Sequence, residues 1–453
     1  MGRRGLIIVC AVIAGCFFVL LSLSMPAAAA VTASLSSDSL PRRPLLGVTA
    51  EPAPDNRIRI ARIIPGSAAA RSELAVGDML LAINGSPVRS VAAFLAGMKL
   101  FKSGDRVICR VQRNQKEMDI EVTLADWPRE QPGDIQVLYD AVDAPKATLR
   151  SLVTIPNGNT RKLPAILFLQ GFDCGSIDWP LPGPHPTREL VYRLTRAGFV
   201  VMRSEKSGVG DSTGTPCHDV GFLDEVSLFT SVLRKLKSYD FVDRENVFLF
   251  GHSAGGWVAP LVAAAEPVKG IVVYGTVVRP YAEYFVENWR RNLRLRSQPD
   301  LANLEDDQRL IAQLLHYVLV EKSSVREATA RHPELTAVAK RLFPDDEHFL
   351  DLRSSQHVRE LNDQNLARVW ASLDVPVLAL IGEFDIRTLP LDHEYIAALV
   401  NARHPGKGIW RLLPKMDHGF ALHESLKDSV DHEFVGPFGE QVVQETLRWI
   451  QVQ

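Results

Sequence analysis

The spacing of apolar residues changes character after about residue 130. Between Pro44 and Leu124, short segments alternate apolar and polar residues, as in RIRIARII, DRVICRVQR and MDIEVTL, and Pro65-Gly66 and Asn84-Gly85 mark turns. This pattern predicts a small α+β domain over residues 44–126. The Pro-rich and charged stretch DWPREQPGD then marks a domain boundary.

A second domain is predicted over residues 134–453, where apolar strand-like runs alternate with amphipathic helical patterns. This alternation is typical of a largely parallel sheet covered by helices. Two weaker strands are expected near Val137 and Leu152. The stronger runs are ILFLQGF, FVVMRS, NVFLFG, GIVVYG, PVLALIG and IWRLLP.

A long excursion separates the strand ending near Thr276 from the one starting at Val375. It has helical periodicity and no clear strand, and it is too long for a loop in a compact domain. We therefore predict a helical cap over about residues 281–372, inserted at the C-terminal edge of the sheet. Its strongest helix is LEDDQRLIAQLLHYVLVEK, in which one face carries Leu310, Ile311, Leu314, Val318 and Leu319.

The first thirty residues have the pattern of a secretory signal peptide. Arg3 and Arg4 precede an apolar run from Leu6 to Leu23, and small residues follow in SMPAAAAV. The alternative is an uncleaved N-terminal anchor that tethers the protein to a membrane through residues 6–23, because the run reaches the lower limit of a membrane span. A lipoprotein cleavage box ending at Cys16 is disfavoured by the apolar FFVLL that follows it. The first two readings predict an exported protein, periplasmic or secreted, with a Ser-rich linker over residues 31–43.

Composition narrows the class of partner. With 46% apolar residues, 23% charged residues and a net charge of -2, the chain is typical of a globular protein and suggests no nucleic-acid partner. No histidine or cysteine cluster has the spacing of metal ligands, so we expect neither a metal nor another cofactor.

The motif Gly251-His252-Ser253-Ala254-Gly255 predicts a nucleophilic serine. It follows a strand and precedes a helix, and the tight turn between them brings the backbones too close for side chains at the two glycine positions. Ser253 needs a base and a group that orients the base. Asp385 and His418, each just past a later strand, are the preferred partners.

Other acids and histidines were weighed for these two roles. Glu383 is close enough in sequence to replace Asp385, whereas Asp374 precedes its strand and would lie at the wrong end of the sheet. His252 adjoins the serine but is expected to point elsewhere. His404 precedes the last strand, and His423 is expected on the following helix.

The order Ser, Asp, His in this context resembles the α/β-hydrolase superfamily, in particular esterases and serine aminopeptidase-like hydrolases, from about Ile135 to Trp449. The resemblance implies a mostly parallel eight-stranded sheet. It also implies an oxyanion hole made by the backbone N–H groups of Ala254 and of Phe172 in FLQGFDCGS. SEKSGVGDSTG is similar to the glycine-rich loop after strand four.

Three cysteines remain after the leader. Cys174 and Cys217 fall in the loops after strands three and four, which are neighbours in this fold, so we expect a disulfide between them. Cys109 lies on a strand of the first domain and is expected to be a buried apolar filler.

LLGV at residues 45–48 and PGSAAARSELAVGDMLLAING at residues 65–85 resemble the PDZ domains of bacterial exported proteins. The resemblance implies that Leu46, Gly47 and Val48 hold the carboxylate of a peptide or protein C-terminus. The helix around Ser90 to Met98 would form the opposite wall of the groove. The alternative is that this domain is a spacer or docks on its own catalytic domain.

The sequence therefore predicts an exported serine hydrolase that cleaves a small acyl substrate, a carboxylic ester before a short peptide or amide. A function of another class stays open, in which a catalytically silent hydrolase domain carries a binding PDZ domain.

Overall fold

A computed structural model of the chain describes residues 40–296 and 300–453. The predicted leader, and the predicted linker as far as residue 39, lie outside the described residues. Residue 42 belongs to the predicted linker but is tightly held, because the buried Arg42 side chain pairs with Asp178 and Asp211. Within the described ranges, no helix combines the length and the apolar character needed to cross a membrane.

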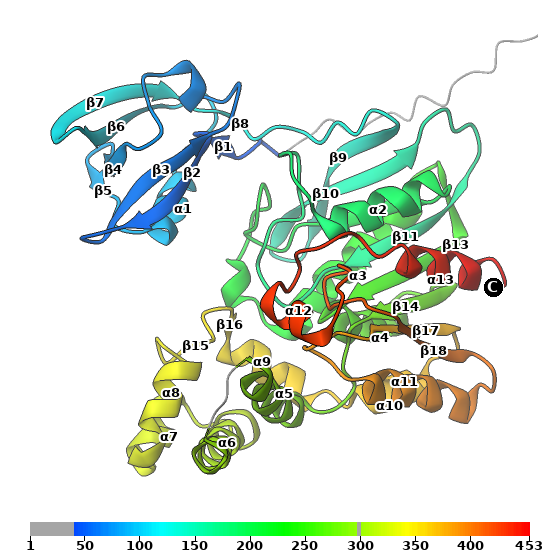
Figure 1. The fold of residues 1–453 in the computed structure, drawn as a ribbon. Helices are drawn as coiled ribbons and strands as arrows, with labels where there is room; N and C mark the ends of the chain where they lie inside the picture. Colours follow the sequence, from blue (N-terminus) through cyan, green and yellow to red (C-terminus); the bar gives the residue numbers. More distant parts are fainter. Residues whose placement is uncertain (1–39, 297–299) are drawn as a thin grey trace, which may run out of the picture. The chain divides into compact units, whose positions relative to one another are not determined.

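An eight-stranded sheet forms the centre of the domain that follows the PDZ region (Figure 1). Its order is β18-β17-β14-β13-β11-β12-β10-β9; β10 is antiparallel to β9 and to β12, and the other neighbours are parallel. This arrangement confirms the predicted fold class. The strands are β9 Ile135–Ala144, β10 Ala147–Pro156, β11 Leu163–Leu169, β12 Val200–Ser204, β13 Val242–His252, β14 Gly270–Tyr274, β17 Val377–Gly382 and β18 Gly408–Leu413.

Helices cover both faces of this sheet. Because successive strand side chains point to opposite faces, Val247 and Leu249 of β13 enter one core, whereas Phe248 and Phe250 enter the other. The first core is covered by α3 Phe222–Ser238, α4 Gly255–Ala265, α10 Leu366–Ser372 and α11 Pro390–Arg403; the second is covered by α2 Pro186–Arg196 and α13 Gln441–Ile450. Continuous apolar runs are thus required of the central strands.

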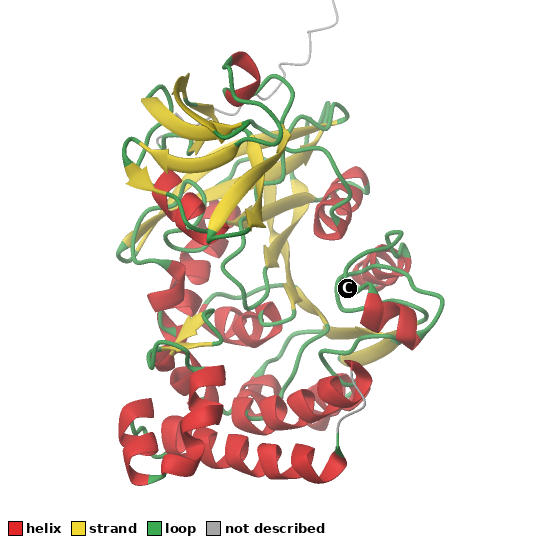
Figure 2. Cartoon of the chain, turned by 60° about the vertical axis from the view of Figure 1, so that its left-hand side comes forward, coloured by secondary structure: helices red, strands yellow, loops and turns green. Residues whose placement is uncertain are grey.

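The excursion between β14 and β17 is mainly helical, as predicted, and its helices gather as a group in Figure 2. It contains α5 Tyr281–Arg296, α6 Leu301–Leu315, the π-helical turn η3 His316–Val320, α7 Val325–Arg331, the 3-10 turn η4 Pro333–Leu335, α8 Thr336–Leu342 and α9 Ser355–Asp363. The single predicted helix is therefore split at residue 316. Ile311, Leu314, Val318 and Leu319 are nonetheless fully buried.

Two features of the excursion differ from the prediction. A short hairpin joins β15 His348–Phe349 to β16 Arg353–Ser354, where no strand was expected. Two-residue strands are too short to leave a periodic pattern. In addition, α10 falls inside the predicted cap range but packs against α4 and α11, so it belongs to the layer of helices on the sheet.

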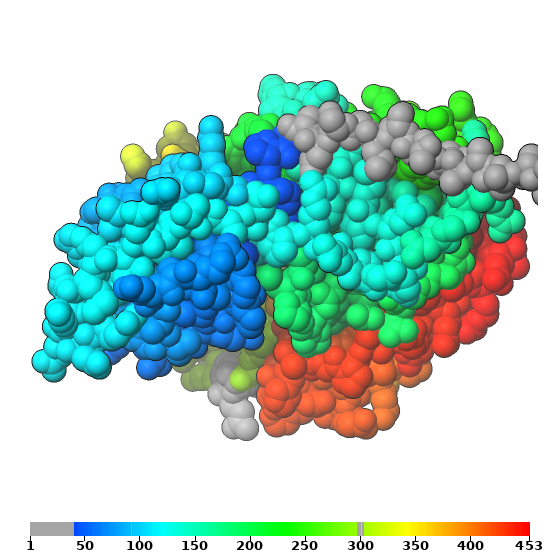
Figure 3. Space-filling view, turned by 90° about the horizontal axis from the view of Figure 1, so that it is seen from above, coloured from blue at the N-terminus to red at the C-terminus, as the bar shows by residue number. Residues whose placement is uncertain are grey.

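The predicted PDZ region folds as a compact sheet with one helix, coloured blue to cyan in Figure 3. Its sheet has the order β2-β3-β4-β6-β7, with β5 on β4, and a separate ribbon pairs β1 with β8. The elements are β1 Pro44–Leu45, β2 Val48–Ala53, β3 Arg57–Ile63, η1 Ala69–Arg71, β4 Met79–Ile83, β5 Ser86–Pro87, α1 Val91–Met98, β6 Arg106–Arg113, β7 Lys116–Thr123 and β8 Ala125–Asp126. Cys109 on β6 is fully buried in its core and is not in a disulfide.

Candidate active site

Ser253 lies on a sharp turn between β13 and α4. Its φ is 55°, in the left-handed region, and its N–H donates to the carbonyl of Tyr274 at 2.9 Å. A Cβ on Gly251 would lie 2.6 Å from the Gly255 carbonyl oxygen, and one on Gly255 would lie 2.0 Å from that of Leu169. Both positions therefore require glycine, as the motif predicts, and the strained turn presents the serine side chain at the edge of the sheet.

Asp385 and His418 meet although they follow different strands, β17 and β18. His418 Nδ1 lies 2.8 Å from Asp385 Oδ2, which also accepts from Thr388 Oγ1 at 2.8 Å. Asp385 Oδ1 accepts from the N–H groups of Arg387 at 2.7 Å and Thr388 at 2.9 Å. Burial alone would raise the pKa of Asp385, but His418 and these hydrogen bonds outweigh it and hold the pKa below its ordinary value. Asp385 is therefore an ionised acceptor that orients the His418 ring.

The rival acids point elsewhere. Glu383 is exposed, and its Oε2 accepts from the N–H of Lys415 at 2.9 Å. Asp374 is exposed beyond the other end of β17, where it lies 2.9 Å from His404. Neither side chain pairs with His418.

His252 supports the loop that carries His418. Its Nε2 lies 2.8 Å from the His418 carbonyl oxygen, so this nitrogen donates. Burial, together with the charge of His418, lowers the pKa of His252 to about 4, which keeps the ring neutral near pH 7.

The placement of His423 corrects the sequence prediction. It precedes α12 Leu426–Asp431 rather than lying on it, and its Nε2 is 3.0 Å from Asp417 Oδ2. Asp417 also accepts from the N–H groups of Gly419, Ala421 and Phe434, so it organises the His418 loop. His423 is held by the carboxylate of Asp417 in a loop, and such a contact leaves no periodic pattern in the sequence from which its place could be predicted.

Ser253 and His418 line one pocket of about 1120 Å³. One wall is aromatic and comes largely from the cap; it comprises Phe172, Trp257, Tyr281, Tyr284, Phe285 and Trp289. The lining also has a polar part, where Glu433 pairs with both Arg387 and Arg296 at 2.6 Å. The pocket thus offers contacts to an apolar group and to a polar group.

Phe172, the predicted oxyanion donor, lies beside the serine. A Cβ on the preceding residue, Gly171, would be 3.4 Å from Ser253 Cβ. Ala254, the other predicted donor, is buried at the start of α4. One of the two N–H groups thus belongs to the residue directly after Ser253, and the other belongs to a separate loop that approaches Ser253 at Gly171.

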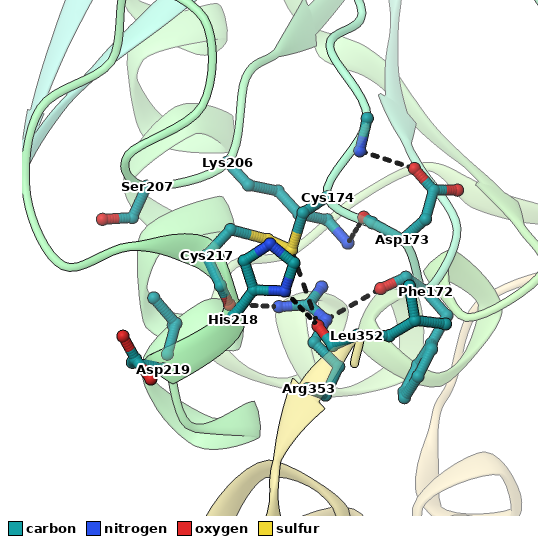
Figure 4. Close-up of a disulfide and its surroundings, with 12 residues drawn as sticks. Phe172, Asp173, Cys174, Lys206, Ser207, Cys217, His218, Asp219, Leu352 and Arg353 are labelled. Carbon is teal, nitrogen blue, oxygen red and sulfur yellow. Dashed lines mark hydrogen bonds between the residues drawn. A yellow bond between two sulfur atoms is a disulfide. The ribbon is translucent and has the colours of Figure 1, made fainter. Parts of the chain in front are cut away.

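Cys174 and Cys217, the predicted pair, are joined by a disulfide with a Cα–Cα distance of 5.9 Å (Figure 4). Cys217 opens the 3-10 turn η2 Cys217–Asp219 in the loop after β12. The bond ties this loop to the one carrying Phe172. It therefore braces the rim of the pocket.

The three residues of the predicted carboxylate loop lead into β2, the edge strand of the PDZ sheet. Leu46 is buried, and Val48 is the first residue of β2, which packs near α1. Gly47 has a φ of 90°, and a Cβ there would lie 2.1 Å from Ser67 Cβ. Only glycine fits this position. Because β2 has a partner on one side only, β3, its other edge is where a peptide strand would add.

Sequence reasoning missed three buried charged residues next to the Phe172 loop of the candidate active site: Lys206, Glu225 and Arg353. Lys206 stands inside the glycine-rich loop that was singled out, but nothing there marked its side chain as buried. Glu225 on α3 precedes a residue of the apolar face, which offered a weak signal.

Within residues 40–296 and 300–453, no group of three or more His, Cys, Asp or Glu side chains is placed to hold a metal ion.

Comparisons with known proteins find similarities in both domains. A family model for serine aminopeptidases matches residues 186–342, and one for PDZ domains matches residues 36–108. Esterase EstD of Thermotoga maritima is 21% identical over 303 residues, which cover 66% of this chain and 64% of that protein. The chain therefore spans less than two thirds of this esterase.

Two further similarities concern single parts of the chain. The periplasmic pH-dependent serine endoprotease DegQ of Escherichia coli is 31% identical over 65 residues, 14% of each chain. A solved structure of DcsB in complex with its substrate analogue is 17% identical with a TM-score of 0.45, covering 70% of this chain and 98% of that one. The larger domain thus has the α/β-hydrolase fold and contains a segment similar to serine aminopeptidases, and a PDZ domain precedes it in the chain.

Proposed function

We propose that this protein is an exported serine hydrolase that cleaves carboxylic esters. One observation carries the proposal: Ser253 on its strained turn and His418, which is hydrogen-bonded to Asp385, line the same pocket, and the three residues come from three different strand ends. This is the arrangement of a nucleophile, its base and the group that orients the base.

In the proposed reaction, Ser253 Oγ attacks the acyl carbonyl while His418 Nε2 takes its proton. Asp385 accepts the Nδ1–H of His418 and stabilises the imidazolium that forms. The N–H groups of Phe172 and Ala254 donate to the carbonyl oxygen as it becomes negative. His418 then protonates the departing alcohol, and water, activated by His418, hydrolyses the acyl-enzyme. The proposal includes a hydrogen bond from Ser253 Oγ to His418 Nε2, along which this proton moves.

The aromatic wall of the pocket supports an apolar acyl group as the preferred substrate. The ring centroids of Trp257 and Tyr281 lie 5.8 Å apart and those of Tyr281 and Phe285 lie 6.2 Å apart, and all three residues line the pocket. Burying an apolar chain there contributes roughly 25 cal/mol per Å² removed from water. An ester with a medium-length or aryl acyl group fits this surface better than a charged one.

A second candidate is the cleavage of short peptides or aminoacyl amides, favoured by Asp173. Its carboxylate lines the pocket one residue after Phe172, and Oδ1 accepts from the N–H of Gly175 at 2.6 Å. A negative group at this place can attract the ammonium group of a free amino terminus.

Export and partner binding complete the proposal. The predicted signal peptide supports transfer across a membrane, with an uncleaved membrane tether at residues 6–23 as the alternative. Two similar serine endoproteases, DegQ and a DegP-like protein of Chlamydia trachomatis, carry the word periplasmic in their names. The PDZ match supports binding of a peptide or protein C-terminus at Leu46, Gly47 and Val48.

Labelling with a fluorophosphonate probe tests the proposed nucleophile. We expect wild-type protein to become covalently labelled, because the probe reacts with a serine activated by a base, and the Ser253→Ala variant to stay unlabelled. Absence of labelling in the folded wild-type protein would instead support a silent hydrolase domain with a binding PDZ domain.

A substrate panel separates the two acyl classes. Chromogenic esters of increasing acyl length should be hydrolysed faster than aminoacyl amides. If the amides are preferred and Asp173→Asn abolishes that preference, the peptidase candidate replaces the esterase.

A further inference from the structure

Three charged side chains are buried behind the loop that carries Phe172. Lys206 follows β12, Glu225 lies on α3, and Arg353 begins β16 of the cap hairpin. Their exposed fractions are 3%, 5% and 0%. Figure 4 shows Lys206 and Arg353 reaching the backbone at Phe172 and Asp173, next to the Cys174–Cys217 disulfide.

The two cations hold three successive carbonyl groups of this loop. Lys206 Nζ donates to the carbonyl oxygens of Gly171 at 2.5 Å and Asp173 at 3.0 Å. Arg353 Nε donates to that of Phe172 at 2.7 Å, the residue between them. Hydrogen bonds from a charged donor are about twice as strong as neutral ones.

Glu225 joins the two cations from behind. Its Oε1 lies 3.2 Å from Lys206 Nζ, and its Oε2 lies 2.8 Å from Arg353 Nη2. One carboxylate facing two cations leaves the trio with a formal charge of +1. That charge is buried close to the place where the proposed oxyanion forms.

The geometry of a single peptide links Lys206 to the oxyanion donor. The carbonyl of Gly171 and the N–H of Phe172 belong to the same planar group, which is trans, since the described residues contain no cis peptide bond. The two ends of a trans peptide point in opposite directions. Because the Gly171 carbonyl is bound to Lys206, the Phe172 N–H at the other end of this peptide points away from Lys206. The peptide lies next to Ser253, since a Cβ on Gly171 would be 3.4 Å from Ser253 Cβ.

We propose that Lys206 is a positioning residue for catalysis, which aims and polarises the Phe172 N–H by binding the carbonyl of the same peptide. This inference rests on the proposed function, because it assigns Lys206 a role only if Phe172 donates to the oxyanion. A cation on the carbonyl draws electrons from the amide and makes its N–H a stronger donor. The benefit is greatest when the substrate oxygen is most negative, which is the transition state.

The charge of Lys206 also gives a pH signature. Burial, together with the charge of Arg353, lowers the pKa of Lys206 to about 8, although the carboxylates of Glu225 and Asp173 oppose the shift. The buried His357 also interacts with Lys206, and burial lowers the pKa of His357 to about 4, so this ring is neutral near pH 8. Lys206 is therefore protonated below about pH 8 and loses its charge as the pH rises through that value. Wild-type kcat should fall across this range.

Replacing Lys206 with Met removes the charge and keeps the apolar stem. We expect Lys206→Met to lower kcat for a chromogenic ester about 10- to 100-fold with KM within about 2-fold, and to remove the alkaline fall. Loss of a whole oxyanion donor costs about 10² to 10³. Lys235→Met is the matched control, because Lys235 lies on α3 and pairs with Asp140 rather than with the Phe172 loop. This control should keep the wild-type kcat and pH profile.

A second variant keeps the test decisive if Lys206→Met fails to fold. Lys206→Arg retains the charge to higher pH, so it should hold more activity than Lys206→Met and shift the alkaline fall of kcat upward. The inference is overturned if Lys206→Met keeps kcat within 2-fold of wild type, or if Lys206→Arg shows the same alkaline fall as wild type. Fluorophosphonate labelling and ester turnover by wild-type protein test the proposed function separately.

Discussion

At the scale of single residues, the ionised state of Asp385 determines how His418 is held. Four hydrogen bonds reach this carboxylate, from His418, from the N–H groups of Arg387 and Thr388, and from Thr388 Oγ1. All four donors favour the charged form, which is why the pKa of Asp385 stays low despite burial, with His418 the leading favourable partner. An amide in its place would offer the ring a donor or would fix the wrong tautomer.

We therefore expect Asp385→Asn to lower kcat by about 10³ to 10⁴ while the fold is retained. Steady-state hydrolysis of a chromogenic ester measures the loss, and circular dichroism checks the fold. Glu383→Gln is the matched control, because Glu383 is exposed and bound to the Lys415 backbone. If the Glu383 variant loses the activity and the Asp385 variant keeps it, the roles of the two acids are reversed.

At the scale of elements, the Phe172 loop is held by contacts from outside its own strand. The disulfide ties it to η2, and Arg353 of β16 donates to the carbonyls of both Phe172 and Cys217. The loop after β11, the loop after β12 and the cap hairpin thus share one anchored region. Loosening this region should affect catalysis before it affects the sheet.

Removing the disulfide tests this anchoring. The bond joins residues 43 positions apart, so the Cys174→Ser, Cys217→Ser double variant should lose about 2–4 kcal/mol of unfolding free energy. We also expect kcat to fall, because the Phe172 N–H is less well placed. Urea unfolding and ester turnover measure the two effects.

In native wild-type protein, alkylation should detect no accessible thiol among residues 40–453, since Cys109 is buried. Ready alkylation of Cys174 or Cys217 without reductant would exclude the bond.

At the scale of the whole molecule, a PDZ domain and a hydrolase domain share one chain. The PDZ sheet offers the edge of β2 and the turn at Gly47, which only glycine can occupy. Main-chain pairing along such an edge supplies affinity, and the loop N–H groups select a terminal carboxylate.

Peptides with a free carboxyl terminus should therefore bind the full chain, and the same peptides with an amidated terminus should not. Fluorescence anisotropy with a labelled peptide library measures this difference. A Gly47→Val variant should lose binding, because its side chain would collide with Ser67, while ester turnover of the hydrolase domain is kept. Equal binding of amidated and free peptides would contradict the assigned carboxylate loop.

Much of the fold was predictable because the local spacing of apolar residues indicates where strands and helices form. Period-two alternation marked the PDZ strands β3, β6 and β7, continuous apolar runs marked strands of the larger sheet, and 3.6-residue periodicity marked the longest cap helix. The glycines around Ser253 reflect a backbone collision that any residue with a Cβ would suffer. Asp385 and His418 were found because strand ends of one parallel sheet meet at the same edge. The two-residue strands of the cap hairpin and the break in its longest helix were missed, since neither has a sufficient period.

The sequence by itself thus determined most of the order of strands and helices along the chain, the turn at Ser253 and the strand ends that carry the proposed nucleophile, base and acid. Only the tertiary structure decided which buried charges hold the Phe172 loop beside that turn. Lys206 reaches a carbonyl 35 positions away in sequence, and Arg353 reaches one 181 positions away. The physical reason is that a side chain's partner is set by the packing of distant elements, and no local pattern of residues records which carbonyl a buried lysine or arginine will meet.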